Sequence, residues 1–265
     1  MSLKRDTKGN LAEVTPLRSR KGSIYKKGLN ETFKISRSKF SSFLDCKRCF
    51  YLDRAKGLKE PGMPGWSLNS AVDELLKKEF DILRKQKKPH PIFKKNKLNF
   101  IPFQHEKMDQ WRNSLKGGIS YFDKNTNVEL YGGLDDIWFN KDKEELVVVD
   151  YKAQSSNEKV ETESYLSNIY HQGYKIQMDI YVYILRKMDF KVSDVSYFYV
   201  CNGEKSYDKF EGKLNFTTTL VPYKTDTSWV DKKIIEMKKV LESSKIPEIN
   251  KSCEHCAYLE GGKKF

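Results

Sequence analysis

Two adjoining β-strands with polar residues at one end constrain the fold of this chain more than any other feature. The first strand is expected within residues 128–139, which contain Gly132-Gly133-Leu134-Asp135, and the second within residues 145–152, which end in Asp150-Tyr151-Lys152. The apolar run before Asp150 predicts a strand buried on both faces, and polar residues at the end of such a strand are the usual place of an α/β active site. Side chains alternate along a strand, so Asp150 and Lys152 should share one face while Tyr151 points to the other.

Asp135, Asp150 and Lys152 together predict a metal-dependent phosphodiesterase site. Two carboxylates with open coordination positions suit a hard, oxygen-seeking ion such as Mg²⁺. An adjacent ammonium group can orient the attacking water and stabilise negative charge that develops on a phosphate. The alternative is structural, because a strand often ends in Asp and Lys where it meets solvent. The Gly-x-x-Asp sequence at residues 132–135 favours the catalytic interpretation.

These residues resemble the PD-(D/E)XK nuclease superfamily and, more narrowly, its RecB-like branch. The similarity continues upstream into residues 35–40 and 46–52, so that it spans residues 35–256. It implies a restriction-endonuclease-like α/β fold, with a central mixed β-sheet flanked by helices. It also implies that Asp135, Asp150 and the Tyr151 carbonyl hold Mg²⁺ or Mn²⁺ while Lys152 acts in catalysis.

Three further residues take part in this resemblance. In the RecB-like branch a helix after the lysine strand carries Gln-x-x-x-Tyr, which here is Gln177 and Tyr181. Residues four apart share one face of a helix, and the resemblance implies that this pair lines the site and contacts DNA. The first helix of the family usually carries a metal-binding histidine, whose position is taken here by Asp73. A carboxylate can also ligate a hard cation; the alternative for Asp73 is a solvated helix residue.

Four of the five cysteines form two Cys-x-x-Cys pairs, Cys46/Cys49 and Cys253/Cys256. Four thiolates can close a tetrahedral site for Zn²⁺ or hold an iron–sulfur cluster. The resemblance to AddB-type and CRISPR adaptation nucleases favours a [4Fe–4S] cluster, although those nucleases divide their cysteines one and three rather than two and two. No signal peptide precedes the chain, so we expect a reducing, cytoplasmic compartment, where disulfides are the weaker alternative. Cys201 is expected to be a buried strand residue.

The basic composition indicates a polyanionic partner. The formal net charge is +13 and no apolar run approaches the length of a membrane span. Basic surface attracts nucleic acid through its phosphates, although a charged surface can also serve solubility alone. Residues 1–30 hold eight basic and two acidic side chains and predict a flexible arm. A second basic cluster at residues 85–97 predicts a loop beside the site.

The order of predicted elements is that of one nuclease domain over residues 31–265. Helices are predicted over residues 38–52, 66–84, 104–122 and 165–188, and strands over 128–139, 145–152, 195–201 and 216–221. A last helix should begin at Thr227-Ser228 and lead to the second cysteine pair. No phosphate-binding loop of a helicase motor is present in the sequence, so any unwinding would need another protein.

The sequence therefore predicts a metal-dependent DNA nuclease acting in DNA repair, recombination or processing. Exonuclease action on single-stranded or end-bearing DNA follows from the resemblance alone. Two other readings stay open: a nucleic-acid-binding or assembly module that keeps the fold without the activity, and a subunit active only with a helicase or other repair and recombination proteins.

Overall fold

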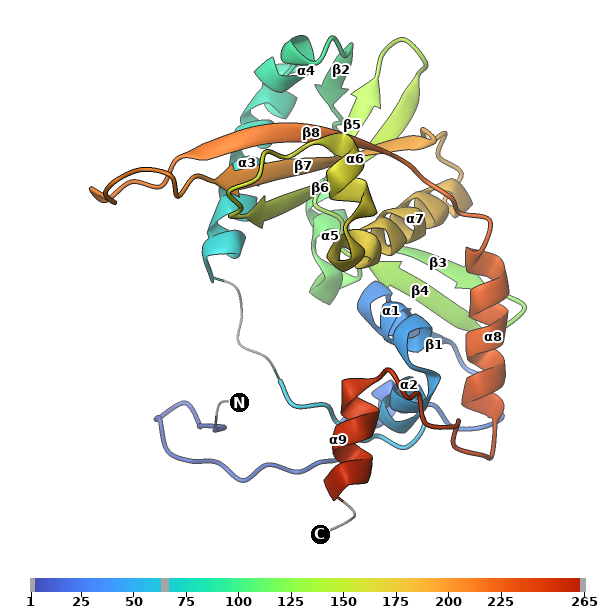
Figure 1. The fold of residues 1–265 in the computed structure, drawn as a ribbon. Helices are drawn as coiled ribbons and strands as arrows, with labels where there is room; N and C mark the ends of the chain where they lie inside the picture. Colours follow the sequence, from blue (N-terminus) through green and yellow to red (C-terminus); the bar gives the residue numbers. More distant parts are fainter. Residues whose placement is uncertain (1–2, 63–66, 263–265) are drawn as a thin grey trace. The chain divides into compact units, whose positions relative to one another are not determined.

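The computed structural model describes residues 3–62 and 67–262, and the chain divides into two compact units. The first unit takes residues 1–65, 122–130 and 231–265, and the second takes residues 66–121 and 131–230. The chain thus leaves the first unit and returns to it, with the second unit formed by the intervening segments (Figure 1).

A five-stranded sheet is the framework of the second unit. Its strands follow the order β2-β5-β6-β7-β8, with bounds Phe100–Pro102, Asp136–Asn140, Glu145–Gln154, Val195–Gly203 and Phe216–Lys224. β6 and β7 are parallel, whereas the other neighbours are antiparallel, so the sheet is mixed. Parallel neighbours need a crossover connection, which is formed by α6 (Thr162–Ser167), η3 (Ile169–His171) and α7 (Gln172–Lys187).

The two faces of β6 serve different purposes, as strand alternation predicts. Val147, Val149 and Tyr151 belong to a hydrophobic cluster with residues of α3 (Ser67–Gln86) and α4 (Pro91–Lys95). Asp150 points to the opposite face, where it meets Gln177 of α7. The sheet is therefore covered by helices on both faces (Figure 1), and the predicted α/β class is confirmed.

α3 presents one continuous stripe to the sheet, formed by Leu76, Phe80 and Arg84. Phe80 is fully buried, with its ring centroid 5.4 Å from Trp138 and 4.4 Å from His90. The predicted start of this helix, Trp66, lies outside the described residues, and the helix ends two residues later than predicted. The basic segment expected as a loop instead contains α4, whose first turn is capped by the His90 ring.

The first unit consists mainly of helices from both ends of the chain, namely α1 (Arg37–Asp45), α2 (Lys47–Arg54), α8 (Val230–Glu242) and α9 (Glu254–Gly262), with η1 (Lys21–Ser23) and β1 (Phe33–Ser36). The single helix predicted over residues 38–52 is wrong, because Cys46 has an extended backbone. Cys46 ends α1 and caps α2, accepting a hydrogen bond at Sγ from the Cys49 N–H at 3.5 Å.

Two other predicted boundaries are corrected. The strand expected over residues 128–139 is split into β4 (Val128–Gly132), which belongs to a sheet of order β1-β4-β3, and β5 of the five-stranded sheet. The helix expected over residues 104–122 is divided into α5 (Met108–Arg112), η2 (Ser114–Lys116) and β3 (Ile119–Asp123). Gly117 and Gly118 have left-handed backbones that end the helical path.

The amino-terminal residues are partly tied to the first unit. Leu17 forms a bridge with Leu58, and the Arg18 guanidinium pairs with the buried carboxylate of Asp53. A flexible arm over residues 1–30 and a single domain over residues 31–265 stay predictions, and residues 1–2 lie outside the described part.

Among the described helices, none is both long and apolar enough to cross a lipid bilayer.

We predict that Phe80→Ala lowers the free energy of unfolding by about 3–5 kcal/mol, because it leaves a cavity among packed aromatic rings. Ile82→Ala on the same helix should change it by less than about 0.5 kcal/mol, because Ile82 is 58% exposed. Chemical denaturation of both variants measures the difference. Equal losses would show that the Phe80 cluster is not the core of this unit.

Candidate active site and metal centre

Asp135, Asp150 and Lys152 lie together in the second unit. Asp150 has no exposed surface, and Lys152, two residues further along β6, forms an ion pair with its Oδ2. Asp135 belongs to the short segment between β4 and β5, and its Oδ2 accepts a hydrogen bond from the Tyr151 N–H at 2.8 Å. The antiparallel pairing of β5 with β6 thus brings the two carboxylates to one end of the sheet.

The charges at this point perturb one another. Burial, with the nearby Asp150 carboxylate, raises the pKa of Asp135 to about 7. Burial would lower the pKa of Lys152, but Asp150 and Asp135 outweigh it and raise that pKa above its ordinary value. Lys152 therefore stays protonated at neutral pH, and a cation shared by the two carboxylates would relieve their repulsion.

Gln177 and Tyr181 connect the two strands of the site from α7. The Gln177 side-chain amide donates to Asp150 Oδ1 at 2.6 Å and also to the Tyr181 hydroxyl at 3.2 Å. The Tyr181 hydroxyl donates to the Gly133 carbonyl at 2.5 Å. Both side chains are buried, so these hydrogen bonds orient the site, while a contact with DNA stays a prediction.

Gly133 has its position because another backbone passes close to it. A Cβ atom at this residue would lie 2.9 Å from both the Arg112 carbonyl oxygen and the Ser114 nitrogen. The same approach allows Arg112 Nε to donate to the Asp135 carbonyl at 3.1 Å. The glycine in the sequence therefore permits α5 to hold the backbone of Asp135.

Asp136 is a residue whose importance the sequence analysis missed. It is fully buried. Its Oδ1 accepts one hydrogen bond from the Arg84 guanidinium and another, at 2.8 Å, from the Arg112 guanidinium. Its Oδ2 accepts from the Tyr151 hydroxyl at 2.8 Å. The spacing of Arg84 with Leu76 and Phe80 on the buried face of α3 was the available signal, because a buried arginine requires a buried acid.

Asp73 lies near the site but pairs with another residue. Its Oδ2 is 2.7 Å from the Lys77 ammonium, which in turn is 3.8 Å from Asp135 Oδ1. Burial and the Asp135 carboxylate raise the pKa of Asp73, so the two acids are close enough to interact. Among the described residues, Asp73, Asp135 and Asp150 are not found as a compact group of possible metal ligands in the way that the four paired cysteines are. Ligation by Asp73 or by the Tyr151 carbonyl stays a prediction.

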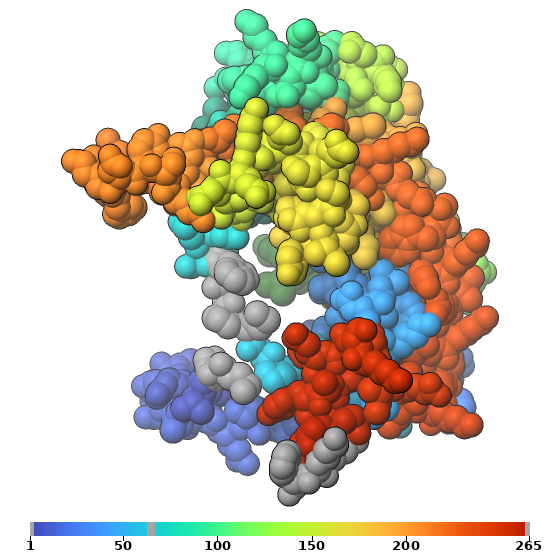
Figure 2. Space-filling model, viewed as in Figure 1, coloured from blue at the N-terminus to red at the C-terminus, as the bar shows by residue number. Residues whose placement is uncertain are grey.

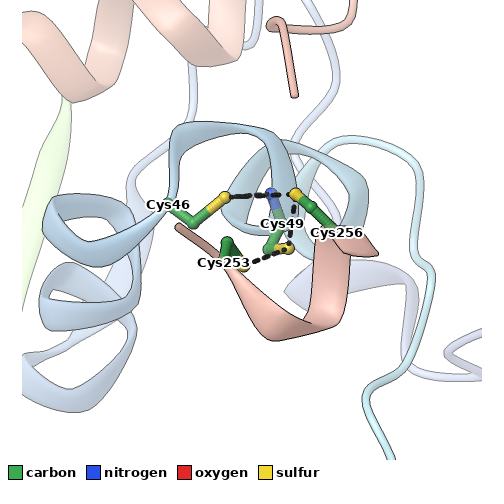
Figure 3. A group of neighbouring side chains, drawn as sticks. All are labelled: Cys46, Cys49, Cys253 and Cys256. Carbon is green, nitrogen blue, oxygen red and sulfur yellow. Dashed lines mark hydrogen bonds between the residues drawn. The ribbon is translucent and has the colours of Figure 1, made fainter. Parts of the chain in front are cut away.

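The four paired cysteines converge in the first unit, as Figure 3 shows. Their sulfurs all lie within 4.8 Å of one another, and the distances from Cys46 to Cys256, from Cys49 to Cys253 and from Cys49 to Cys256 are each 3.6 Å. Each pair lies at the start of a helix, α2 or α9. This donor set fits a thiophilic metal, and Cys201 belongs to the other unit, buried in β7.

Comparison with known families decides the assignment of the fold. A model described as the PD-(D/E)XK nuclease superfamily matches residues 66–260, which is more than half of the 265-residue chain. The chain belongs to the PD-(D/E)XK nuclease superfamily. Membership confirms the predicted superfamily and supports nuclease activity with divalent metals, as is usual for PD-(D/E)XK nucleases.

Other comparisons are more distant. A solved structure from Eubacterium rectale, of a protein provisionally named an exonuclease, shares 14% sequence identity with this PD-(D/E)XK chain, with a TM-score of 0.41. The match covers 85% of this chain and 87% of the other. No curated protein matches the chain significantly.

We predict that Asp135→Asn stabilises the metal-free protein above pH 7. The carboxyl titrates near 4 in an unfolded chain and near 7 in the fold, so wild-type stability falls as pH rises through this range. At pH 8 the variant should be more stable by on the order of 1–3 kcal/mol, with no difference at pH 4. Thermal unfolding in EDTA-treated, Mg²⁺-free buffer measures this, and Asp194→Asn, at an exposed carboxylate, should show no such trend.

We also predict that Cys49→Ser lowers both the bound metal per chain and the Tm. Four thiolates would hold a structural ion, and the energy of binding it would contribute directly to folding. Cys201→Ala is the matched control, since it removes a thiol outside the cluster. Elemental analysis and calorimetry of anaerobically purified protein give both readouts. Unchanged metal content in Cys49→Ser would contradict a metal at the cysteines.

Proposed function

We propose that this chain is a metal-dependent DNA nuclease of the RecB-like branch, acting as an exonuclease on single-stranded or end-bearing DNA. The observation that carries the proposal is the meeting of Asp135, Asp150 and Lys152, held from α7 by Gln177 and Tyr181. The same five residues are those that the resemblance to this branch assigns to the site. A formal charge of +13 supports a nucleic-acid substrate.

The side chains of the site support a division of roles in phosphodiester hydrolysis. Asp135 and Asp150 would hold Mg²⁺ or Mn²⁺, which when bound would polarise the phosphate and activate the attacking water. Lys152, whose pKa is raised by Asp150 and Asp135 despite burial, would keep its proton, orient the water and stabilise negative charge on the phosphate. Gln177 would fix the orientation of the Asp150 carboxylate through their 2.6 Å hydrogen bond.

For the cysteine cluster, the spacing of the sulfurs supports one tetrahedral ion. Four sulfurs at about 2.3 Å from a central Zn²⁺ stand about 3.8 Å apart, which is close to the three distances of 3.6 Å. A [4Fe–4S] cluster binds each thiolate through a different iron, so its sulfurs must stand further apart. We therefore propose Zn²⁺ as the ion, and the [4Fe–4S] cluster implied by the resemblance is the alternative that iron and sulfide analysis would reveal.

The nuclease is tested with end-labelled single-stranded and duplex DNA in Mg²⁺ or Mn²⁺. We predict cleavage by the wild type and a loss of at least about 100-fold in Asp150→Ala and in Lys152→Ala, since each removes a charge that acts on the transition state. Lys159→Ala is the matched control, because Lys159 is an exposed lysine of the same unit. The product ladder distinguishes exonuclease from endonuclease action and gives polarity.

Two outcomes would redirect the proposal. If the folded, metal-loaded wild type binds DNA without cleaving it, the chain is a binding or assembly module, or a subunit that needs a helicase or another repair or recombination protein. If the wild type and both variants cleave equally, Asp150 and Lys152 are not the catalytic residues and the activity belongs to a contaminant or to another site.

A further inference from the structure

Among the residues that the structure describes, four lysines and no acidic residue line a hollow of about 450 Å³ in the second unit. Its lining comes from α4, from β2 and from the residues that follow α3, α4 and β5, and it includes Lys87, Lys94, Lys97 and Lys141. The α4 segment, teal in Figure 2, lies on the surface of the molecule. Four ammonium groups around one open hollow create a local positive potential suited to an anion.

These lysines have no acidic partner within the part of the chain that the structure describes. Salt bridges there engage other lysines, such as Lys77 and Lys78 of α3. The nearest acid in sequence, Asp142, accepts a hydrogen bond from the Asn99 side chain at 2.6 Å. The positive charge of the hollow is therefore available to a ligand.

Two of the lysines occupy backbone positions that favour glycine. Lys87 and Lys97 have φ values of 54° and 55°. Lys87 directly follows α3, and Lys97 follows Asn96, the residue that caps the end of α4. In each case the next residue donates back to the helix, Lys88 to Leu83 at 3.0 Å and Leu98 to Phe93 at 2.9 Å. This is the helix-ending motif in which glycine is usual. A lysine in this left-handed conformation costs conformational free energy that a glycine would not. Both lysines that adopt it line the same hollow.

The hollow lies away from the catalytic carboxylates. Asp136 begins β5 at the active-site end, and Lys141 follows the last residue of β5. At about 3.3 Å per residue, Asp136 and Lys141 are about 17 Å apart along the strand. Along α3, Asp73 and Lys87 are separated by about 21 Å at 1.5 Å per residue. A duplex rises 3.4 Å per base pair, so the hollow and the active site are about five to six base pairs apart.

We propose that this lysine-lined hollow is a second contact for the phosphate backbone of the nucleic-acid substrate, remote from the cleavage site. The inference rests on the proposed nuclease function and extends it to the path of the substrate. Lysine ammonium groups act as point charges without base recognition, so the contact is independent of sequence and holds the polymer while its end is in the active site.

The test is Lys87→Gly combined with Lys97→Gly, which removes two charges while relieving both left-handed backbones. Binding of a fluorescent 20-nucleotide single strand and of its duplex is measured by anisotropy over a range of KCl, with Ca²⁺ replacing Mg²⁺ and DNA integrity checked on gels. We expect a Tm equal to or above that of the wild type. The slope of log K against log salt should fall in magnitude by about 2 for the duplex, near 0.9 for each lost phosphate contact, and by about 1.4 for the single strand, near 0.7 for each.

Two controls separate this contact from general effects. Lys232→Gln with Lys239→Gln removes the same charge from exposed positions of α8 and should leave the slope unchanged. Asp189→Gly relieves a left-handed residue after α7, where φ is 65°, and should raise stability without weakening DNA binding. A slope that falls equally in the charge control, or does not fall in the hollow variant, overturns the proposal.

The experiments can contradict the nuclease function and the backbone contact at the hollow independently of each other. Cleavage absent from the wild type contradicts the nuclease but leaves the binding slope as a measure of the hollow. Calorimetric titration with ATP distinguishes a site for the nucleic-acid backbone from a site for a small phosphorylated ligand. ATP binding that the paired lysine substitutions abolish, with an unchanged DNA slope, would assign the hollow to a small phosphorylated ligand and overturn the backbone contact.

Discussion

The buried carboxylate of Asp136 is the constraint on which the active-site end of the second unit depends. A charge without solvent must be paired, and removing one partner of such a pair costs about 3–5 kcal/mol. Arg84 from α3, Arg112 from α5 and the Tyr151 hydroxyl from β6 all converge on Asp136. Since Arg112 also donates a hydrogen bond to the Asp135 carbonyl, pairing the buried charge also fixes the backbone that carries the proposed metal-binding carboxylate of Asp135.

Strand alternation places the charged residues of the site on one face of β6 and the packing residues on the other. Asp150 and Lys152 face α7, while Tyr151 between them points into the aromatic cluster under α3. Tyr151 connects both sides, because its N–H donates to Asp135 and its hydroxyl donates to Asp136. A shift of one residue in the pairing of β5 with β6 would exchange the faces and break both bonds.

The local patterns that predicted the site were those that do not depend on tertiary contacts. Strand alternation was enough to predict that Asp150 and Lys152 share one face, and helical spacing was enough to predict that Gln177 and Tyr181 do. The partners of Asp136 were missed because Arg84 and Arg112 come from separate helices, joined only by folding. The helix expected over residues 104–122 failed for a similar reason, since the close passage of Gly118 and Gly133 against neighbouring backbone outweighs apolar periodicity.

The two proposed metal sites make different demands on the chain. The hard-ion site gathers its residues from neighbouring strands and one helix of the second unit, whose sheet and buried charges are formed without the four paired cysteines. The cysteine cluster instead joins helices from opposite ends of the sequence within the first unit. Closing so long a segment has an entropic cost, which metal binding can offset. Loss of the cysteine-bound ion should therefore act first on the first unit, leaving the bonds around Asp135 and Asp150 in place.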